Sequence, residues 1–212
     1  SNTLLGIKFI YYLLHPRKIT IIDYGGGFGT LYTMTEKLSK EINFDINSIV
    51  IDNSSNIKKG KTFFKENKNL KFYDYKTTSA LKIIEEKTSE GELTLLNLSS
   101  VIQYIHPYKQ FISDLLKNKK PLIVCITRFP RCEDSSSDAF TIQDITTSDG
   151  FCGSTIVNLF GKDSIKNLMD EIGYDLLTEN FNYLGDHADY FFNCENKSFK
   201  SITLVAYTFI RK

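Results

Sequence analysis

Residues 19–30 read Ile-Thr-Ile-Ile-Asp-Tyr-Gly-Gly-Gly-Phe-Gly-Thr, and this is the most informative stretch of the chain. A short β-branched run ends in a cluster of glycines, and a helical pattern begins at Thr30. Glycines between a strand and a helix let a ligand approach the backbone, and a helix N-terminus offers free N–H groups. The stretch therefore predicts a strand, a ligand-binding turn and a helix, in that order.

The same order of apolar run, turn and helical pattern repeats along the chain. Further strands are expected at residues 48–52, 70–73, 93–98 and 122–127, and helices at 30–40, 55–66, 79–87, 107–117 and 162–172. Alternating strands and helices predict βαβ units and a mostly parallel sheet, and continuously apolar strands are typical of strands covered on both faces. Two later runs, at 176–184 and 201–210, lie too close together for a helical crossover and predict an antiparallel pair at the end of the sheet. The fold class is therefore α/β: a doubly wound, Rossmann-like, mostly parallel sheet of about seven strands with the last one antiparallel.

The length of 212 residues fits a single domain, residues 1–212, with residues 1–18 as a helical lead-in. Residues 128–160 contain Pro130, Gly150, Gly153 and a serine-rich patch, and they have no clear period. So long an irregular segment is usually functional. We expect a lid or substrate-recognition insertion there, after the fifth strand.

Composition narrows the class of partner. The 26 basic and 25 acidic residues give a net charge of +1, which disfavours a nucleic-acid partner because phosphate binding needs a basic excess. The 16 Phe and 12 Tyr supply enough apolar area for a core, and no apolar run is long enough to span a membrane. The four cysteines form no CxxC pair or zinc-like cluster, so we expect no metal. With no signal-peptide pattern either, a cytoplasmic location is expected.

Two ligand classes fit the glycine turn. The dinucleotide fingerprint needs Gly or Ala where the chain has Thr30, whereas the observed spacing is Asp23-x-Gly25-x-Gly27-x-Gly29. This spacing resembles motif I of class I S-adenosylmethionine-dependent methyltransferases. A carboxylate suits that ligand, which carries an ammonium and a sulfonium, and would repel a pyrophosphate. A tight turn without a ligand is the plainer alternative.

The resemblance implies S-adenosyl-L-methionine as cofactor and S-adenosyl-L-homocysteine as product, with the acid of motif I near the methionine moiety. An acid at the end of the second strand, here Asp52, commonly accepts hydrogen bonds from ribose hydroxyls, although Asp52 could instead cap a helix. Asp74 after the third strand matches the family's acid near the adenine amino group, or else lies in a solvated turn. The cofactor residues expected are Asp23, Tyr24, Gly25, Gly26, Gly27, Gly29, Asp52, Asn53, Asp74, Tyr75, Leu98, Ser99 and Ser100.

A narrower resemblance follows from three segments taken together. Asp23-Tyr24-Gly25-Gly26, the run Leu96–Ile105 and Arg128-Phe129-Pro130 are similar to a bacterial methyltransferase family associated with surface-polysaccharide biosynthesis. The resemblance covers residues 19–130 and is looser beyond, around Thr141-Ile142-Gln143. Asp52 stands where that family has Glu, a conservative departure. The resemblance implies methyl transfer more firmly than any particular acceptor.

Catalytic and substrate residues are harder to assign, because methyl transfer mainly needs alignment of the nucleophile and exclusion of water. An oxygen nucleophile also gains from a general base, and His106 and His187 are the candidates, each with a plain loop or turn as the alternative. Arg128 and Arg131 would suit a phosphorylated or nucleotide-sugar acceptor, unless they pair with Glu133 or Asp134. The substrate residues expected are Gln103, Tyr104, Arg128 and Arg131.

The sequence thus favours a methyltransferase that O-methylates a sugar or another surface-polysaccharide precursor. Two rival hypotheses stay open: a non-catalytic or partner-dependent S-adenosylmethionine-binding subunit, and a nicotinamide-dependent oxidoreductase. The expected partner is a small-molecule acceptor of sugar or nucleotide-sugar type. A homodimer is left open.

Overall fold

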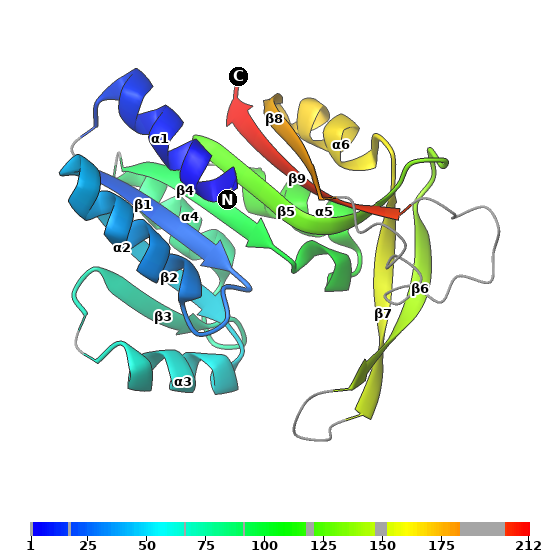
Figure 1. Cartoon of the computed structure of the whole chain (residues 1–212), viewed down its shortest axis with the longest axis horizontal. Coiled ribbons are helices and arrows are strands. Elements are labelled where there is room, and N and C mark those ends of the chain that lie inside the picture. Colours follow the sequence, from blue (N-terminus) through cyan, green and yellow to red (C-terminus); the bar gives the residue numbers. More distant parts are fainter. Residues whose placement is uncertain are drawn as a thin grey trace.

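The computed structural model describes residues 2–16, 18–65, 67–90, 92–117, 121–146, 152–182 and 202–212 (Figure 1). The helices are α1 (Asn2–Leu14), α2 (Thr30–Ile42), α3 (Ser54–Phe63), α4 (Ala80–Ser89), the short 3₁₀ helix η1 (Ile102–Tyr104), α5 (Tyr108–Leu116) and α6 (Ser164–Ile172). The strands are β1 (Lys18–Tyr24), β2 (Asp45–Asp52), β3 (Leu70–Asp74), β4 (Leu93–Ser99), β5 (Ile123–Cys132), β6 (Ala139–Thr146), β7 (Cys152–Gly161), β8 (Tyr174–Asn182) and β9 (Ile202–Arg211).

The central sheet has the predicted doubly wound order. Strands β3, β2, β1, β4 and β5 are neighbours in that order and all pair in parallel. Strand β9 pairs antiparallel with β5 and with β8, which confirms the expected antiparallel pair at the end of the sheet. Strand β1 lies between β2 and β4, and Asp23 is in register with Val50 on one side and Asn97 on the other. The carboxyl ends of these strands therefore meet at one edge of the sheet.

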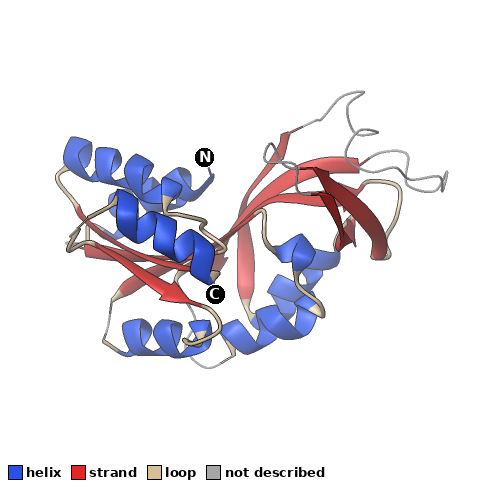
Figure 2. Cartoon of the chain, turned by 90° about the horizontal axis from the view of Figure 1, so that it is seen from below, coloured by secondary structure: helices blue, strands red, loops and turns tan. Residues whose placement is uncertain are grey.

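Helices cover both faces of the sheet, as the continuously apolar strands predict (Figure 2). Successive strand residues point to opposite faces, so Ile21 and Ile22 of β1 enter different apolar clusters. Ile21 shares one cluster with Ile7 and Ile10 of α1. Ile22 shares the other with Ile84 of α4 and Ile112 of α5. Helices α1 and α2 both pack on the face that carries Ile21. The site forms between these two helices, at the carboxyl ends of β1 and β4.

The segment after the fifth strand is a β-hairpin and not the irregular loop that we expected. Strand β5 runs on to Cys132, and β6 pairs with β7 antiparallel from Ala139↔Leu159 to Thr146↔Cys152. The hairpin extends away from the main sheet (Figure 1) and accounts for two strands beyond the expected seven. Strands β6 and β7 show no clear alternation of apolar and polar residues because apolar side chains lie on both faces: Leu159 is 1% exposed, whereas Phe140 is 69% exposed.

Within the described residues, no helix combines the length and the apolar character that a membrane span needs.

Candidate functional site

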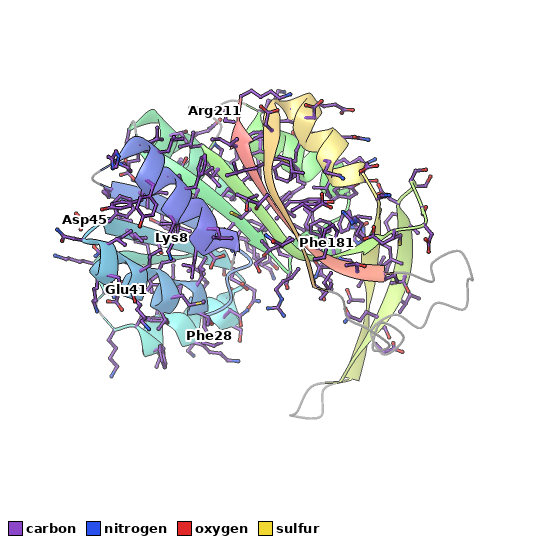
Figure 3. The ribbon with its side chains drawn as sticks, turned by 45° about the horizontal axis from the view of Figure 1, so that its top comes forward. Lys8, Phe28, Glu41, Asp45, Phe181 and Arg211 are labelled. Carbon is purple, nitrogen blue, oxygen red and sulfur yellow. The ribbon has the colours of Figure 1, made fainter. Side chains whose placement is uncertain are left out.

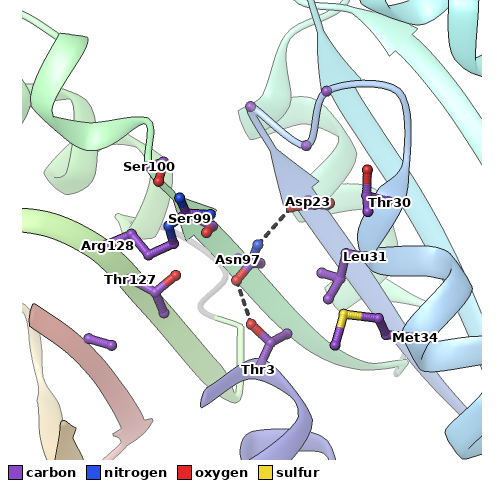
Figure 4. A pocket seen from close by; sticks show the side chains of 14 residues that line it. Thr3, Asp23, Thr30, Leu31, Met34, Asn97, Ser99, Ser100, Thr127 and Arg128 are labelled. Atoms are coloured by element: carbon purple, nitrogen blue, oxygen red, sulfur yellow. Dashed lines mark hydrogen bonds between the residues drawn. The ribbon is translucent and has the colours of Figure 1, made fainter. Parts of the chain in front are cut away.

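A cavity of about 490 Å³ lies at the carboxyl ends of β1, β4 and β5, beside α1 and α2 (Figure 4). A volume of this order suits a small-molecule ligand, which α/β sheets bind at this edge. The lining residues are Thr3, Asp23, Gly25, Gly26, Gly27, Thr30, Leu31, Met34, Asn97, Ser99, Ser100, Thr127, Arg128 and Ala206. The cavity thus brings together the glycine turn, the end of β4 and Arg128, which the sequence analysis had singled out separately.

The glycine turn has a shape that side chains would disturb. Gly25 and Gly27 have φ angles of 73° and 62°, in the left-handed region. A Cβ on Gly25 would lie 2.6 Å from Val101 Cγ2, and a Cβ on Gly26 would lie 2.3 Å from Asp23 Oδ2. A Cβ on Gly27 would meet nothing within 4 Å. The lack of a side chain at Gly27 therefore leaves open space beside the turn. The lack of one at Gly25 and Gly26 lets the turn pack closely against Val101 and Asp23.

Asp23 is the acidic side chain in the cavity wall, and it is only 3% exposed. Asn97 Nδ2 donates a hydrogen bond to Asp23 Oδ1 at 2.7 Å (Figure 4). Burial raises the pKa of Asp23 to about 6, the hydrogen bond from Asn97 opposes that rise, and the nearby charge of Asp52 adds to it. A buried carboxylate at a cavity wall is a binding point for a cationic group.

Asp52 lies directly behind the glycine turn. The backbone N–H of Gly27 donates to Asp52 Oδ2 at 2.7 Å. The other carboxylate oxygen, Oδ1, accepts hydrogen bonds from Asn53 N at 2.7 Å, Asn53 Nδ2 at 2.8 Å and Asn56 Nδ2 at 2.9 Å. Asn53 also caps α3 by accepting from Asn56 N at 3.0 Å. Asp52 and Asn53 thus support the turn and do not line the cavity itself.

Asp74 and Tyr75 lie next to Asp52 but face a different hollow. The N–H of Tyr75 donates to the carbonyl of Asp52 at 3.1 Å. Asp74 accepts hydrogen bonds from Ser54 Oγ and from Lys76 N, which lower its pKa. It lines an open hollow of about 680 Å³ between α3 and β3. The predicted adenine end is therefore adjacent to the cavity without being part of its lining.

Three other predicted cofactor residues also lie outside the cavity lining. Tyr24 packs its ring 5.1 Å from that of Phe111, on the opposite face of the sheet. Leu98 is 1% exposed and belongs to the main core. Gly29 is the N-cap of α2, where a Cβ would lie 3.2 Å from Phe72 Cζ. The turn residue before it, Phe28, is 46% exposed at the outer surface (Figure 3).

Arg128 lies on the cavity wall formed by β4 and β5. It is the extra residue at a bulge in β5 and has a φ angle of 60°, and Ser100 across from it has a φ angle of 53°. The N–H of Ser100 donates to the carbonyl of Thr127 at 2.8 Å, which ties the two strand ends together. Left-handed backbone at residues other than glycine is strained and clusters at functional sites. Within the described part of the chain, the Arg128 guanidinium has no ion-pair partner.

Arg131, the other arginine predicted to bind substrate, has a different environment. Its side chain is 3% exposed and forms ion pairs with Glu133, at 2.7 Å, and with Glu179. Tyr207 Oη lies 2.6 Å from Nη1, and the Phe181 ring lies 4.9 Å from Cζ. The pairing with Glu133 matches the structural alternative considered from the sequence. These partners hold Arg131 between β5, β8 and β9 and leave it outside the cavity lining.

Of the two histidine candidates, the structure describes His106, which is not among the cavity-lining residues. His106 is exposed beside the hairpin, with Nε2 3.4 Å from the carbonyl oxygen of Ile156 and its ring 5.4 Å from that of Phe140. His187 lies outside the described residues. Among the described residues, no group of three or more His, Cys, Asp or Glu side chains could hold a metal ion.

The remaining substrate candidates, Gln103 and Tyr104, also contact the hairpin. Tyr104 Oη donates to Gln143 Oε1 at 3.0 Å. Gln103 is 7% exposed, and its carbonyl accepts from Asn158 Nδ2 at 3.2 Å. Of the predicted catalytic and substrate residues that the structure describes, Arg128 therefore lies in the cavity lining, Arg131 lies in its ion-pair network, and Gln103, Tyr104 and His106 lie beside the hairpin.

Thr3 and Asn97 are cavity residues that the sequence analysis missed. Asn97 interrupts the otherwise apolar run Leu93–Leu98, and that polar residue in a buried strand was the available signal. Thr3 had no such signal, because α1 precedes the first strand and reaches the cavity only through the packing of helix on sheet.

Comparison with known proteins assigns the fold. No protein-family model matches the chain. No curated protein matches it either. Solved structures do match: a SAM-dependent methyltransferase from Methanosarcina mazei has a TM-score of 0.56 at 12% identity, with 96% of each chain covered.

Two further matches were solved with ligands. The glycopeptide N-methyltransferase MtfA, complexed with sinefungin, has a TM-score of 0.54 at 10% identity, with 97% of this chain and 85% of that chain covered. LepI in complex with SAM has a TM-score of 0.54 at 9% identity, with 97% of this chain covered. The chain spans 46% of the length of LepI. The chain therefore has the Rossmann-like fold of SAM-dependent methyltransferases, and at these identities the likeness establishes the fold alone.

Proposed function

We propose that the chain is an S-adenosylmethionine-dependent methyltransferase. The observation that carries this proposal is the buried carboxylate of Asp23 in a cavity walled by Gly25, Gly26 and Gly27. A carboxylate in that position suits a ligand that carries an ammonium and a sulfonium, and it disfavours the pyrophosphate of a dinucleotide. SAM or sinefungin bound to proteins of the same fold gives independent support.

The residues present fit this cofactor, which when bound supplies a methyl group activated by its sulfonium. Asp23 would hold the ammonium of the methionine moiety. Asp52 lies outside the cavity lining but is partly exposed, and its Oδ2 accepts one hydrogen bond, from Gly27. It therefore has capacity left for a ribose hydroxyl of a cofactor that extends past the glycine turn. The side chains of Leu31 and Met34 in the same lining offer an apolar surface to the methylene chain of the methionine moiety. Asp74 and Tyr75, beside Asp52, remain the candidates for the adenine end.

We further propose that the acceptor is a hydroxyl of a sugar or another surface-polysaccharide precursor. The hydroxyls of Ser99, Ser100 and Thr127 line the cavity beside Arg128 and can bind a polyhydroxylated ligand. The resemblance of residues 19–130 to methyltransferases of surface-polysaccharide biosynthesis supports the same class. A cytoplasmic location goes with such a precursor.

In this proposal, catalysis depends chiefly on alignment. An in-line displacement at an activated methyl group needs the acceptor oxygen held in line and water excluded. Arg128 and the three hydroxyls would orient the acceptor. His106, at the hairpin, becomes a general base only if the acceptor extends from the cavity to η1.

A methyl-transfer assay tests the proposal. The protein is incubated with S-adenosylmethionine labelled in the methyl group and with nucleotide-sugars and sugar phosphates as acceptors. The expected result is label in an acceptor, lost in Asp23→Ala, with Arg128→Gln reducing transfer more than cofactor binding. Cofactor binding without transfer to any acceptor would favour the non-catalytic subunit, and binding of NADH in place of the S-adenosyl ligands would favour the oxidoreductase.

A further inference from the structure

Three side chains from three separate elements form a chain of hydrogen bonds in the cavity wall. Thr3 Oγ1 of α1 donates to Asn97 Oδ1 of β4 at 2.8 Å, and Asn97 Nδ2 donates to Asp23 Oδ1 of β1 at 2.7 Å. Figure 4 shows both bonds running from the helix to the carboxylate. Thr3, Asn97 and Asp23 are 3%, 2% and 3% exposed. All three lie where hydrogen bonds are strong and unmade ones are costly.

The first bond supports the second. An asparagine amide can present either its oxygen or its NH₂ group to a neighbour. An ionised carboxylate only accepts, so the NH₂ group of Asn97 must face Asp23 and its oxygen must face Thr3. The opposite orientation would place an amide oxygen against a carboxylate, and the two would repel. The Thr3 hydroxyl donates to the amide oxygen and so stabilises the orientation in which Asn97 donates to Asp23.

The second bond favours the charged form of Asp23. Burial and the carboxylate of Asp52 both favour the protonated acid, and the hydrogen bond from Asn97 opposes them. Arg128 lines the same cavity from β5 and is the cationic side chain among its lining residues. A protonated Asp23 would have no charge with which to attract an ammonium group.

We propose that Thr3 and Asn97 are positioning residues that keep Asp23 ionised and aimed, so that docking of α1 is required for full cofactor affinity near neutral pH. This inference rests on the proposed S-adenosylmethionine site. Helix α1 would then contribute to cofactor binding, in addition to packing on one face of the sheet.

The test is calorimetric titration of the full chain with S-adenosylhomocysteine at pH 6, 7 and 8.5. Thr3→Val removes the hydroxyl at nearly constant volume, and Thr3→Ser retains it. Thr94→Val is the matched control, because Thr94 lies on β4, is 1% exposed, and its hydroxyl has no partner among the described residues. Comparing each variant with the parent chain at the same pH cancels the ionisation of the ligand.

If loss of the Thr3 hydroxyl raises the pKa of Asp23 by about one unit, Thr3→Val binds about fivefold more weakly at pH 6, about twofold more weakly at pH 7, and equally at pH 8.5. Thr3→Ser and Thr94→Val should bind like the parent chain at every pH. A carboxyl NMR titration of Asp23 in the ligand-free protein should move upward in Thr3→Val alone. Thr3→Ala provides the same comparison should the valine variant not fold.

The outcomes separate the two proposals. If the parent chain binds S-adenosylhomocysteine but Thr3→Val and Thr3→Ala match its affinity and its Asp23 titration, the positioning role is wrong and the cofactor site stands. If the parent chain does not bind S-adenosylhomocysteine at any pH, the proposed function itself fails. A loss of affinity in Thr3→Val that is equal at all three pH values would indicate a structural role only, and would overturn the inference.

Discussion

The backbone N–H of Gly27 donates a hydrogen bond of 2.7 Å to Asp52 Oδ2, so the acid at the end of β2 holds the glycine turn at the end of β1. The two residues are 25 positions apart and meet because β1 and β2 are parallel neighbours. Asp52 thus has a structural role in the glycine turn in addition to the ribose contact that we propose for it.

Asp52→Asn should weaken both the fold and the cofactor site. An asparagine cannot accept from Gly27 at one atom and from Asn53 and Asn56 at the other, so at least one donor loses its partner. We expect a loss of about 1–3 kcal/mol in the free energy of unfolding, measured by urea denaturation, and at least about tenfold weaker binding of S-adenosylhomocysteine. Asp45→Asn, an exposed change at the other end of β2, should alter neither quantity. Equal behaviour of the two variants would refute this account of Asp52.

Two glycine substitutions should differ in effect, although both glycines have left-handed backbone. Gly27→Ala should cost about 1–2 kcal/mol of stability, from backbone strain alone, because its Cβ meets nothing within 4 Å. Gly25→Ala should cost clearly more, because its Cβ would also lie 2.6 Å from Val101. Thermal or urea unfolding of the pair measures the difference. A Gly25→Ala variant as stable as Gly27→Ala would mean that the turn is not packed against Val101.

Asp23→Asn should stabilise the ligand-free protein at pH 7 while removing cofactor binding. Burial raises the pKa of Asp23 from its ordinary value of 3.8 to about 6 in the folded chain, so the folded state holds the proton more tightly. The free energy of unfolding therefore falls as pH rises from about 4 to about 6, and the ionised carboxylate costs about 3 kcal/mol at pH 7. Asparagine avoids that cost and can still accept from Asn97.

The measurement is urea denaturation of both proteins from pH 4 to pH 8. The stability difference in favour of Asp23→Asn should grow with pH up to about pH 6 and then stay constant. A difference that is independent of pH, or one that favours Asp23 at pH 7, would contradict the buried, high-pKa carboxylate.

Arg128 and Arg131 provide a matched pair. Arg128→Gly should raise the free energy of unfolding by about 1 kcal/mol, because the φ angle of 60° suits glycine, and should lower acceptor methylation. Arg131→Met should lower it by about 3–5 kcal/mol, because two carboxylates would lose their buried partner. Urea denaturation and the methyl-transfer assay measure both effects. A stable Arg131→Met variant would show that the network around Arg131 is dispensable.

The sequence predicts the sheet well because its strands have one dominant requirement, burial on both faces. The same reasoning fails at the β6–β7 hairpin, where Val157 and Leu159 are buried but Phe140 and Ile142 are exposed, so hydropathy does not follow a single face. The glycine turn and Asp23 could be predicted because their chemistry is contiguous in sequence.

The rest of the site could not be predicted in the same way. Thr3 and Asn97 are 94 positions apart, and Asn97 and Asp23 are 74 apart, so only the strand order β1–β4 and the packing of α1 bring them together. Arg128 and Arg131 have the same side chain three positions apart, and the neighbours that tertiary packing gives them decide that one lines the cavity and the other joins an ion-pair network. Long-range packing, which no local pattern encodes, decides these cases.

The most direct test of the central claim is calorimetric titration of the purified chain with S-adenosylmethionine, S-adenosylhomocysteine and NADH, beside Asp23→Ala. The account predicts micromolar binding of both S-adenosyl ligands by the parent chain, no binding of NADH, and loss of binding in Asp23→Ala. Binding of NADH alone, or of none of the three ligands, would contradict the claim that this cavity is an S-adenosylmethionine site.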